Sequence, residues 1–253
     1  MSRQPTALAA DVEAGLRRLR LAAIRREAPE VLATAKTQRW APEELLRVLV
    51  EAEIASRDAS NTRNRMAAAR FPIDKTLNEF RLDESSIPRA SNDYLVTLEW
   101  IHHAENLCLV GPAGTGKTHY LIGLGRAAVD AGYKVRYFTA IDLVEHLYRA
   151  VADNTVGKAI EAVCRNDLII IDEIGFAPLD HTGCQLLFRL VAAGYEHRSI
   201  AIGSHSPFND WGRFLPDQPT AVSLLDRLCH HAHIITTTGD SYRLTHRTTR
   251  KET

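Results

Sequence analysis

The amino-acid sequence predicts an α/β fold, a parallel sheet with helices on both faces, which a small all-helical domain precedes. Short apolar runs alternate with helical stretches after residue 105, and this order is typical of parallel sheets. Before residue 71 the apolar residues instead recur at helical spacing. We therefore expect a helical N-terminal domain over residues 1–70, a linker into the core over residues 71–105, and an α/β domain with a short C-terminal segment over residues 106–253.

The helical N-terminal domain is expected to begin with residues 7–36, whose apolar side chains recur at helical spacing. Pro29 is expected to divide this stretch into two helices. Pro42 suits the first turn of a further helix, and the two glutamates that follow it would lie at the positive end of the helix dipole. This helix is expected to run toward Arg70 and to end there, because the residue before Pro72 avoids helical backbone angles.

Residues 72–93 are expected to form a linker with a short helix near Thr76–Phe80, because Pro, Asp, Ser and Asn recur there. The segment Leu215–Ala221 contains two prolines and is expected to be an exposed loop. The sheet is expected to consist of five apolar runs: Leu107–Val110, Lys134–Thr139, Leu168–Ile171, Ser199–Ser204 and His233–Thr238.

The composition is that of a folded globular protein, with 253 residues, 45% of them hydrophobic and 25% charged. This balance excludes a largely disordered or collagen-like chain. Basic and acidic residues number 31 each, but the first 70 residues hold 13 basic and 9 acidic ones. The local excess favours a nucleic acid or another acidic partner for the N-terminal region.

The cysteines and apolar runs indicate where the protein works. Its four cysteines show no C-x-x-C pairing, which favours reduced thiols in a cytosolic protein. The first thirty residues lack the apolar stretch of a signal peptide, and no apolar run approaches the ~18 residues of a membrane span. We expect a cytoplasmic protein with no membrane partner.

A glycine-rich segment, Gly111–Thr118, fits the P-loop pattern G-x-x-x-x-G-K-S/T at every defined position. An expected strand precedes it and a helical run, Lys117–Asp130, follows. Backbone N–H groups of such a loop surround phosphates, Lys117 would reach the β- and γ-phosphates, and the Thr118 hydroxyl would bind Mg²⁺. The expected ATP contacts are Gly111, Pro112, Ala113, Gly114, Thr115, Gly116, Lys117, Thr118 and His119.

Two adjacent carboxylates, Asp172 and Glu173, end the apolar run that begins at Leu168. The carboxyl end of a central strand is where open α/β sheets bind ligands. Asp172 would hold Mg²⁺ through water, and Glu173 would polarise a water for attack on the γ-phosphate. The second carboxylate argues against a nucleotide kinase, which transfers phosphate to a substrate rather than to water.

Two arginines are further candidates for the nucleotide site. Arg227 could be an arginine finger that a neighbouring subunit supplies, or equally a solvated helix residue. Arg243 could reach the phosphates of its own subunit, or be an ordinary basic residue near the end of the chain. His230, His231 and His233 invite a metal site, but no Cys–His pair at zinc-finger spacing accompanies them, and their apolar neighbours favour a helix-to-strand corner.

A basic and polar run closes the N-terminal region and is a candidate DNA-binding surface. Such runs more often form a solvated helix face. The candidate DNA contacts are Arg57, Arg63, Arg65 and Arg70.

With these residues in hand, the chain resembles the IstB family of transposition helper ATPases, relatives of the DnaC-like helicase loaders within the AAA+ class. The P-loop alone indicates only a P-loop NTPase, and later sequence strings single out this family. Those strings include Arg70-Phe71-Pro72, Leu98-Glu99-Trp100-Ile101, Pro207-Phe208-Asn209-Asp210-Trp211-Gly212, Leu225-Asp226-Arg227-Leu228 and Ser241-Tyr242-Arg243-Leu244.

The resemblance implies an AAA+ P-loop fold and an ATP-dependent homo-oligomer that grips and deforms duplex DNA. It also implies stimulation of a partner transposase from the same element. Lys117, Thr118, Asp172 and Glu173 match the nucleotide site. Arg227 matches the arginine finger that acts on the site of a neighbouring subunit. Arg243 matches the family's sensor-II-like arginine.

The chain departs from the family at the end of the fourth expected strand, where His205 replaces the usual sensor-I asparagine. A neutral imidazole still donates one hydrogen bond, so His205 could keep the sensor role or slow hydrolysis. Two alternatives therefore stay open. One is a DnaC-like replicative helicase loader without a zinc module, since no Cys or His precedes His102. The other is an ATP-switched DNA-binding adaptor that hydrolyses slowly.

Overall fold

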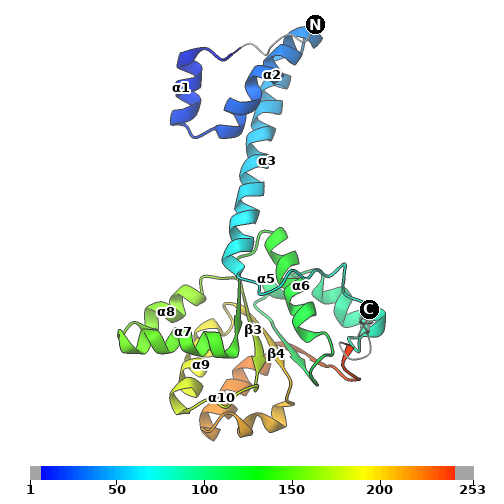
Figure 1. Ribbon diagram of the computed structural model, residues 1–253, viewed down its shortest axis with the longest axis vertical. Coiled ribbons are helices and arrows are strands. Elements are labelled where there is room, and N and C mark those ends of the chain that lie inside the picture. The colour runs from blue at the N-terminus through cyan, green and yellow to red at the C-terminus, as the bar shows by residue number, and fades with distance from the viewer. Residues whose placement is uncertain (1–6, 243–253) are drawn as a thin grey trace, which may run out of the picture. The chain divides into compact units, whose positions relative to one another are not determined.

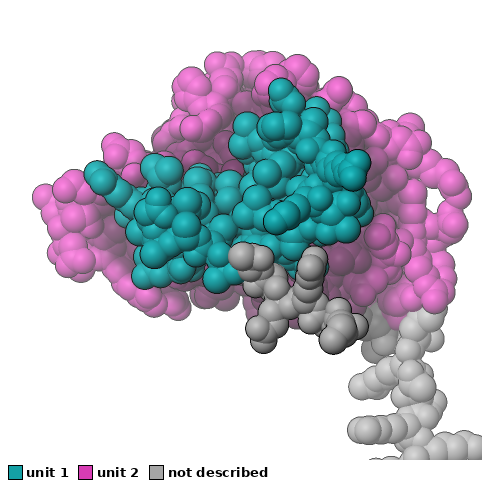
Figure 2. Space-filling model, turned by 90° about the horizontal axis from the view of Figure 1, so that it is seen from above, with its two compact units in different colours: residues 1–64 teal, residues 65–253 magenta. Residues whose placement is uncertain are grey.

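The computed structural model describes residues 7–242 (Figure 1). It contains two compact units, residues 1–64 and residues 65–253, which Figure 2 colours separately. The division falls six residues before the expected boundary at 70/71. The expected helix that begins at Pro42 is present as α3 (Pro42–Ala69), and it continues from the first unit into the second. Arg70 then adopts a left-handed conformation, with φ at 57°.

The first unit contains α1 (Ala10–Arg18), α2 (Ala22–Gln38) and most of α3. A buried carboxylate, Glu53 on α3, accepts hydrogen bonds from the backbone N–H groups of Ala23 (2.9 Å) and Ile24 (3.2 Å). These are orphan donors of the first turn of α2, so a side chain 30 residues away caps this helix. Arg57 donates to the other oxygen of Glu53 at 2.9 Å.

The break between the first two helices is not where the sequence indicated. Pro29 lies inside α2, and the chain turns instead at Arg20, whose φ is 58°. The N–H of Leu21 donates to the Leu16 carbonyl and closes the preceding helix. The cap from Glu53 then fixes where α2 begins. Because this cap is a tertiary contact, local sequence rules do not mark it.

The Glu53 cap should make the N-terminal end of α2 sensitive to acid. The hydrogen bond from Arg57, helped by the two backbone N–H groups and opposed by desolvation, lowers the pKa of Glu53 below its ordinary value. A carboxyl pKa that is lower in the folded than in the unfolded state stabilises folding above the ordinary pKa range, and this contribution disappears as pH falls through the lowered pKa. Glu53→Ala removes the acceptor altogether and should therefore expose the Ala23 and Ile24 amides to exchange even at neutral pH.

Hydrogen–deuterium exchange of peptides covering the start of α2 measures this effect in the full chain. Glu51→Ala, at an exposed carboxylate of the same helix, is the matched control and should leave exchange unchanged. Equal exchange in the parent protein and in Glu53→Ala would mean that the carboxylate does not cap α2.

The second unit is built on a five-stranded parallel sheet in the order β2-β3-β4-β1-β5. Every residue of β1 and β4 is buried, as expected for a sheet covered on both faces. The five expected strands are confirmed. Their bounds are β1 Asn106–Val110, β2 Val135–Thr139, β3 Leu168–Ile174, β4 Ser199–Ser204 and β5 Ala232–Thr236.

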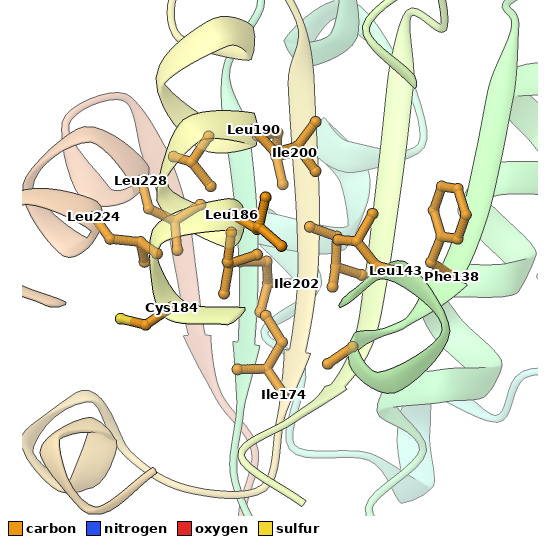
Figure 3. Packing of buried hydrophobic residues seen from close by; sticks show 14 of the residues in the cluster. Phe138, Leu143, Ile174, Cys184, Leu186, Leu190, Ile200, Ile202, Leu224 and Leu228 are labelled. Carbon is orange, nitrogen blue, oxygen red and sulfur yellow. The ribbon is translucent and has the colours of Figure 1, made fainter. Parts of the chain in front are cut away.

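Helices cover both faces of the sheet and enclose two apolar cores. Leu143, Leu186, Ile202 and Leu224 belong to one core, which Figure 3 shows in close-up. The opposite core includes Trp100 and Leu121, and α6 lies on this side of the sheet (Figure 1). The first core takes side chains from α7 (Ala140–Ala152), α8 (Val156–Val163), α9 (His181–Gly194) and α10 (Gln218–Cys229), and the second from α4 (Arg89–Leu95), α5 (Glu99–His102) and α6 (Lys117–Asp130).

The segment expected to be a linker, residues 71–105, belongs to the second unit and packs against its core. Phe71, Leu77 and Phe80 contact that core, and the expected helix near Thr76–Phe80 is instead a turn followed by the short 3-10 helix η1 (Leu82–Glu84). The expected loop at 215–221 is also wrong, because Leu215 is only 1% exposed and α10 begins at Gln218. In both segments apolar side chains pack between residues that are typical of turns. A second 3-10 helix, η2, covers Phe208–Arg213.

Within residues 7–242, none of the helices is both long and apolar enough to span a membrane.

Candidate active site

A cavity of about 560 Å³ lies at the carboxyl ends of β1, β3 and β4. Residues that the sequence singled out line it, namely Ala113 to His119 of the P-loop and the start of α6, Asp172, Glu173 and His205. The structure thus brings together residues that lie up to 92 positions apart. Gly111 and Pro112 complete the loop just outside the cavity lining.

The P-loop is held in place by the chain that follows β5. The N–H of Tyr242 donates to the Gly114 carbonyl at 3.0 Å, and the hydroxyls of Thr115 and Thr237 lie 2.8 Å apart. Gly114 has a left-handed backbone, with φ at 86°, and a Cβ there would collide with the Ser241 side chain. Glycine is therefore required at 114 both for its backbone angles and for this close approach.

Lys117 begins α6 and is only 9% exposed. Its ammonium donates to the carbonyl oxygens of Gly111 and Pro112, each at 2.6 Å. These bonds hold the charge within the glycine-rich loop, at the positive end of the α6 dipole. The neighbouring Thr118 is half-buried and presents its side chain at the same cavity.

Asp172 is 2% exposed, and both of its carboxylate oxygens have partners. Oδ2 accepts from the Tyr137 hydroxyl at 3.1 Å, and Oδ1 accepts from the N–H of Glu173 at 2.9 Å. Burial, together with the Asp172 charge, raises the pKa of Tyr137, which therefore stays a protonated donor. A Cβ at Gly203 of β4 would collide with Oδ1, so glycine leaves room for the carboxylate.

Glu173 occupies an irregular position in β3. Its φ is 61°, and the pairing of β3 with β4 shifts register between Ile171 and Ile174. In a regular strand, consecutive side chains point to opposite faces. The irregularity explains how Asp172 and Glu173 both line one cavity. A left-handed backbone at a non-glycine residue costs on the order of 1–3 kcal/mol, and such strain clusters at functional sites.

His205 follows β4 directly and is exposed at the cavity. The hydroxyl of Ser204 donates to the Ile174 carbonyl (3.1 Å) and fixes the end of the strand. Phe176, 74% exposed, lies with its ring centroid 6.4 Å from that of His205. The residue expected at the sensor position thus lies on the same cavity as the two carboxylates.

The remaining candidates for the nucleotide site differ in where they lie. Arg227 on α10 does not line the cavity; it donates to the Ser223 carbonyl at 3.0 Å, and its guanidinium lies 5.1 Å from the centroid of the Phe188 ring. The Nε2 atom of His119 lies 2.9 Å from the carbonyl oxygen of Thr76. Arg243 lies outside the described residues.

Sequence reasoning missed three groups at this site. The first two are Tyr137, which donates a hydrogen bond to Asp172, and Gly203, which leaves room for its carboxylate. Both lie on strands next to β3, so their positions beside Asp172 follow only from the strand order. The third is the supposed linker, whose side chains form one wall of the cavity. These wall residues are Ile73, Lys75, Glu79, Phe80, Arg81, Glu84 and Ser85.

The four candidate DNA contacts are divided between the two units. Arg57 belongs to the first unit and is bonded to Glu53 and to the Arg20 carbonyl. Arg63, also in the first unit, is exposed and donates to Ser60. Arg65 and Arg70 belong to the second unit. Burial is the main cause that lowers the pKa of His146, and the positive charges of Arg136, Arg149 and Arg70 lower it further.

Comparison with known proteins identifies the family. The family described as IstB-like ATP binding protein matches residues 14–250. The chain belongs to this IstB-like family. One relative is a protein of insertion sequence IS5376 from Geobacillus stearothermophilus that is named for ATP binding. It is 36% identical over 211 residues, which cover 83% of this chain and 84% of that protein. A protein of insertion sequence IS21 from Pseudomonas aeruginosa, also named for ATP binding, is 33% identical over 235 residues, covering 92% and 89%.

Two solved structures share the fold of this IstB-like chain at low sequence identity. The DnaC helicase loader superposes with a TM-score of 0.51 at 17% identity, covering 64% of this chain and 96% of that one. DnaI superposes with a TM-score of 0.54 at 14% identity, covering 65% and 91%. These likenesses confirm the expected AAA+ P-loop fold and carry no further conclusion about activity.

The space that Gly203 leaves for Asp172 is a testable feature of the site. Gly203→Ala places a methyl group against a buried carboxylate and should destabilise the second unit by about 1–3 kcal/mol, the usual cost of overpacking. Urea unfolding followed by tryptophan fluorescence measures this change. Gly157→Ala is the control, because a Cβ there meets nothing within 4 Å, and it should leave stability equal or slightly higher. Matching midpoints for the two variants would show that the sheet accommodates the methyl group.

Proposed function

We propose that the chain is an ATP-hydrolysing transposition helper, which converts ATP and water to ADP and phosphate. It assembles with copies of itself on duplex DNA, deforms that DNA and stimulates the transposase of the same insertion sequence in the cytoplasm. The observation that carries the proposal is the convergence of Lys117, Thr118, Asp172 and Glu173 on one cavity. The relatives from insertion sequences support the transposition context.

The residues present fit ATP together with Mg²⁺. The P-loop backbone and the start of α6 suit the phosphates, and Lys117 adds a positive charge beside them. The Thr118 hydroxyl and the Asp172 carboxylate are hard oxygen donors of the kind that Mg²⁺ prefers, and Gly203 leaves room for that carboxylate at the end of the sheet. When bound, Mg²⁺ would neutralise charge on the phosphates.

Glu173 is placed to act on water. Its carboxylate is exposed at the cavity, next to the buried Asp172. As water attacks the γ-phosphoryl group, the carboxylate would accept its proton and later release it to solvent. A neutral His205 can donate one hydrogen bond to the attacking water or to a phosphate oxygen and so orient them.

A replicative helicase loader is the second candidate, because the fold is shared with the DnaC loader. The insertion-sequence relatives favour the transposition helper. A slowly hydrolysing adaptor is the third, because histidine replaces asparagine at the sensor position. Rates of hydrolysis and the ligands needed for assembly separate the three.

Removing the charge of Glu173 tests the hydrolytic role. Glu173→Gln should bind ATP as the parent does, while hydrolysis falls by on the order of 10²-fold or more because the water loses its proton acceptor. Lys117→Ala should instead lose nucleotide affinity. Titration with a fluorescent ATP analogue and phosphate release measure the two effects separately. Glu161→Gln, on an exposed carboxylate of α8, serves as the control. Parental turnover in Glu173→Gln would rule out this residue as the base.

Arg227 tests whether neighbouring subunits cooperate. If it completes the neighbour's site, Arg227→Ala should bind ATP but lose ~10³-fold or more in turnover. Mixing Arg227→Ala with Lys117→Ala subunits should restore part of the activity, because one interface then pairs an intact site with an intact arginine. Loss of the contact with Phe188 alone would not be repaired by mixing.

Co-purification of differently tagged subunits must accompany this assay, and Arg189→Ala, an exposed arginine on α9, is the control. Mixed assemblies that form and stay inactive would exclude Arg227 as the finger. Arg198, the next candidate, donates to the Cys164 carbonyl at 2.6 Å.

Assembly on DNA separates the helper from the helicase loader. With a non-hydrolysable ATP analogue and duplex DNA together, the chain should form a large complex that neither ligand produces alone. DNA affinity should fall steeply with salt, because phosphate contacts release counterions. Replacing Arg63, Arg65 and Arg70 with glutamine should flatten the salt slope by up to about three contacts' worth.

Size-exclusion chromatography with light scattering and fluorescence anisotropy measure these quantities. The matched control replaces three exposed arginines of the second unit that lie outside the basic run, Arg165, Arg189 and Arg213, with glutamine. Assembly that is indifferent to DNA would favour the loader. An unchanged salt slope would show that the basic run is only a solvated face.

A further inference from the structure

We propose a binding site for a divalent transition metal of the zinc class, formed by Glu196, His230 and His231. One potential ligand atom of each residue lies within 4.8 Å of those of the other two. All three side chains are exposed, so an ion can reach them from solvent. Small rotations of these side chains would bring the three atoms around one ion.

Two separate parts of the second unit supply the ligands. Glu196 lies in the turn between α9 and β4, with φ at 59°, and His230 caps the end of α10. His231 immediately precedes β5, and its carbonyl accepts from the N–H of Asn106 at 2.7 Å. The backbone on the histidine side is therefore tied to the sheet.

A hydrogen bond already orients one of the imidazoles. The Tyr195 hydroxyl lies 2.8 Å from Nδ1 of His230. Histidines that bind metals commonly use one ring nitrogen for the metal and donate from the other to a neighbouring oxygen, which fixes the ring. When Tyr195 accepts the hydrogen of Nδ1, Nε2 of His230 carries the lone pair that a metal requires.

The donor set selects the class of ion. Two neutral imidazoles and one carboxylate suit Zn²⁺ far better than Mg²⁺ or Ca²⁺, which prefer oxygen ligands. Three protein ligands leave a coordination position for water. The carboxyl end of α10 also carries the negative end of the helix dipole, which favours a cation.

The structure changes the expectation drawn from the three histidines in the sequence. His233 is not part of the cluster, because its Nε2 lies 2.6 Å from Oε2 of Glu105. Its place is taken by Glu196, which lies 34 residues before His230 and which no spacing rule connects to it. The helix-to-strand corner favoured by the sequence is present, and its exposed side carries the cluster.

A bound ion would link the α9–β4 turn to the end of α10. Arg227 lies three residues before His230 and packs on Phe188 of α9. The ion would thus brace the two helices that hold the proposed arginine finger. This consequence rests on the proposed function, whereas metal binding itself does not.

Zinc titration of the full chain, free of any histidine tag and treated with chelator, tests the site. Isothermal titration and metal analysis after dialysis should give one tightly held Zn²⁺ per chain. His230→Ala, His231→Ala and Glu196→Gln should each weaken binding at least tenfold. Tyr195→Phe keeps all three ligands and should still weaken binding by ~10–100-fold, the usual effect of losing an outer-shell partner.

The matched control is the other pair of adjacent histidines, His102 and His103, whose ring centroids lie 5.5 Å apart. Among the described residues this pair belongs to no three-ligand cluster, so replacing both with alanine should leave zinc binding unchanged. Lys117→Ala should also bind zinc normally, which separates this site from the nucleotide site. Absence of stoichiometric binding, or binding that survives in the His230→Ala/His231→Ala double variant, would overturn the proposal.

Discussion

The buried carboxylate of Asp172 is the constraint around which the second unit is organised. A charge that is 2% exposed is tolerated only when its oxygens are hydrogen-bonded, and here Tyr137 of β2 and the Glu173 N–H supply the bonds. Gly203 of β4 supplies the space. The three strands at this edge are thus adjusted to one side chain, and the left-handed backbone that brings Glu173 to the same cavity comes directly after it.

Local sequence patterns were sufficient to predict the strands of the sheet and the position of the P-loop. Apolar runs identified all five strands, and the helix after the P-loop begins and ends at the residues expected, Lys117 and Asp130. These features are determined by residues that lie close together in the sequence, so the local spacing of residue types is enough to predict them. The same is true of Asp172 and Glu173, because a carboxylate at a strand end is visible without knowing the strand order.

The features that were missed depend on contacts between distant segments. Glu53 sets the start of α2 from another helix, so Pro29 did not break the chain where local rules placed the break. Residues 71–105 contain turn-forming residues, yet Leu95 and Trp100 are fully buried in the core. Tyr137, Gly203 and Glu196 acquire their positions only when the order of the strands and the packing of the helices are known.

The contact between the P-loop and the chain after β5 also has a consequence for how this sequence can diverge. Gly114 tolerates no side chain, because its backbone is left-handed and a Cβ there would collide with Ser241, so a larger side chain at 241 that points the same way would press on the loop. The loop therefore constrains position 241, although the two positions lie 127 residues apart in the sequence. A bulky residue introduced at 241 during evolution or engineering would behave as a P-loop mutation, although it lies at the opposite end of the domain's sequence.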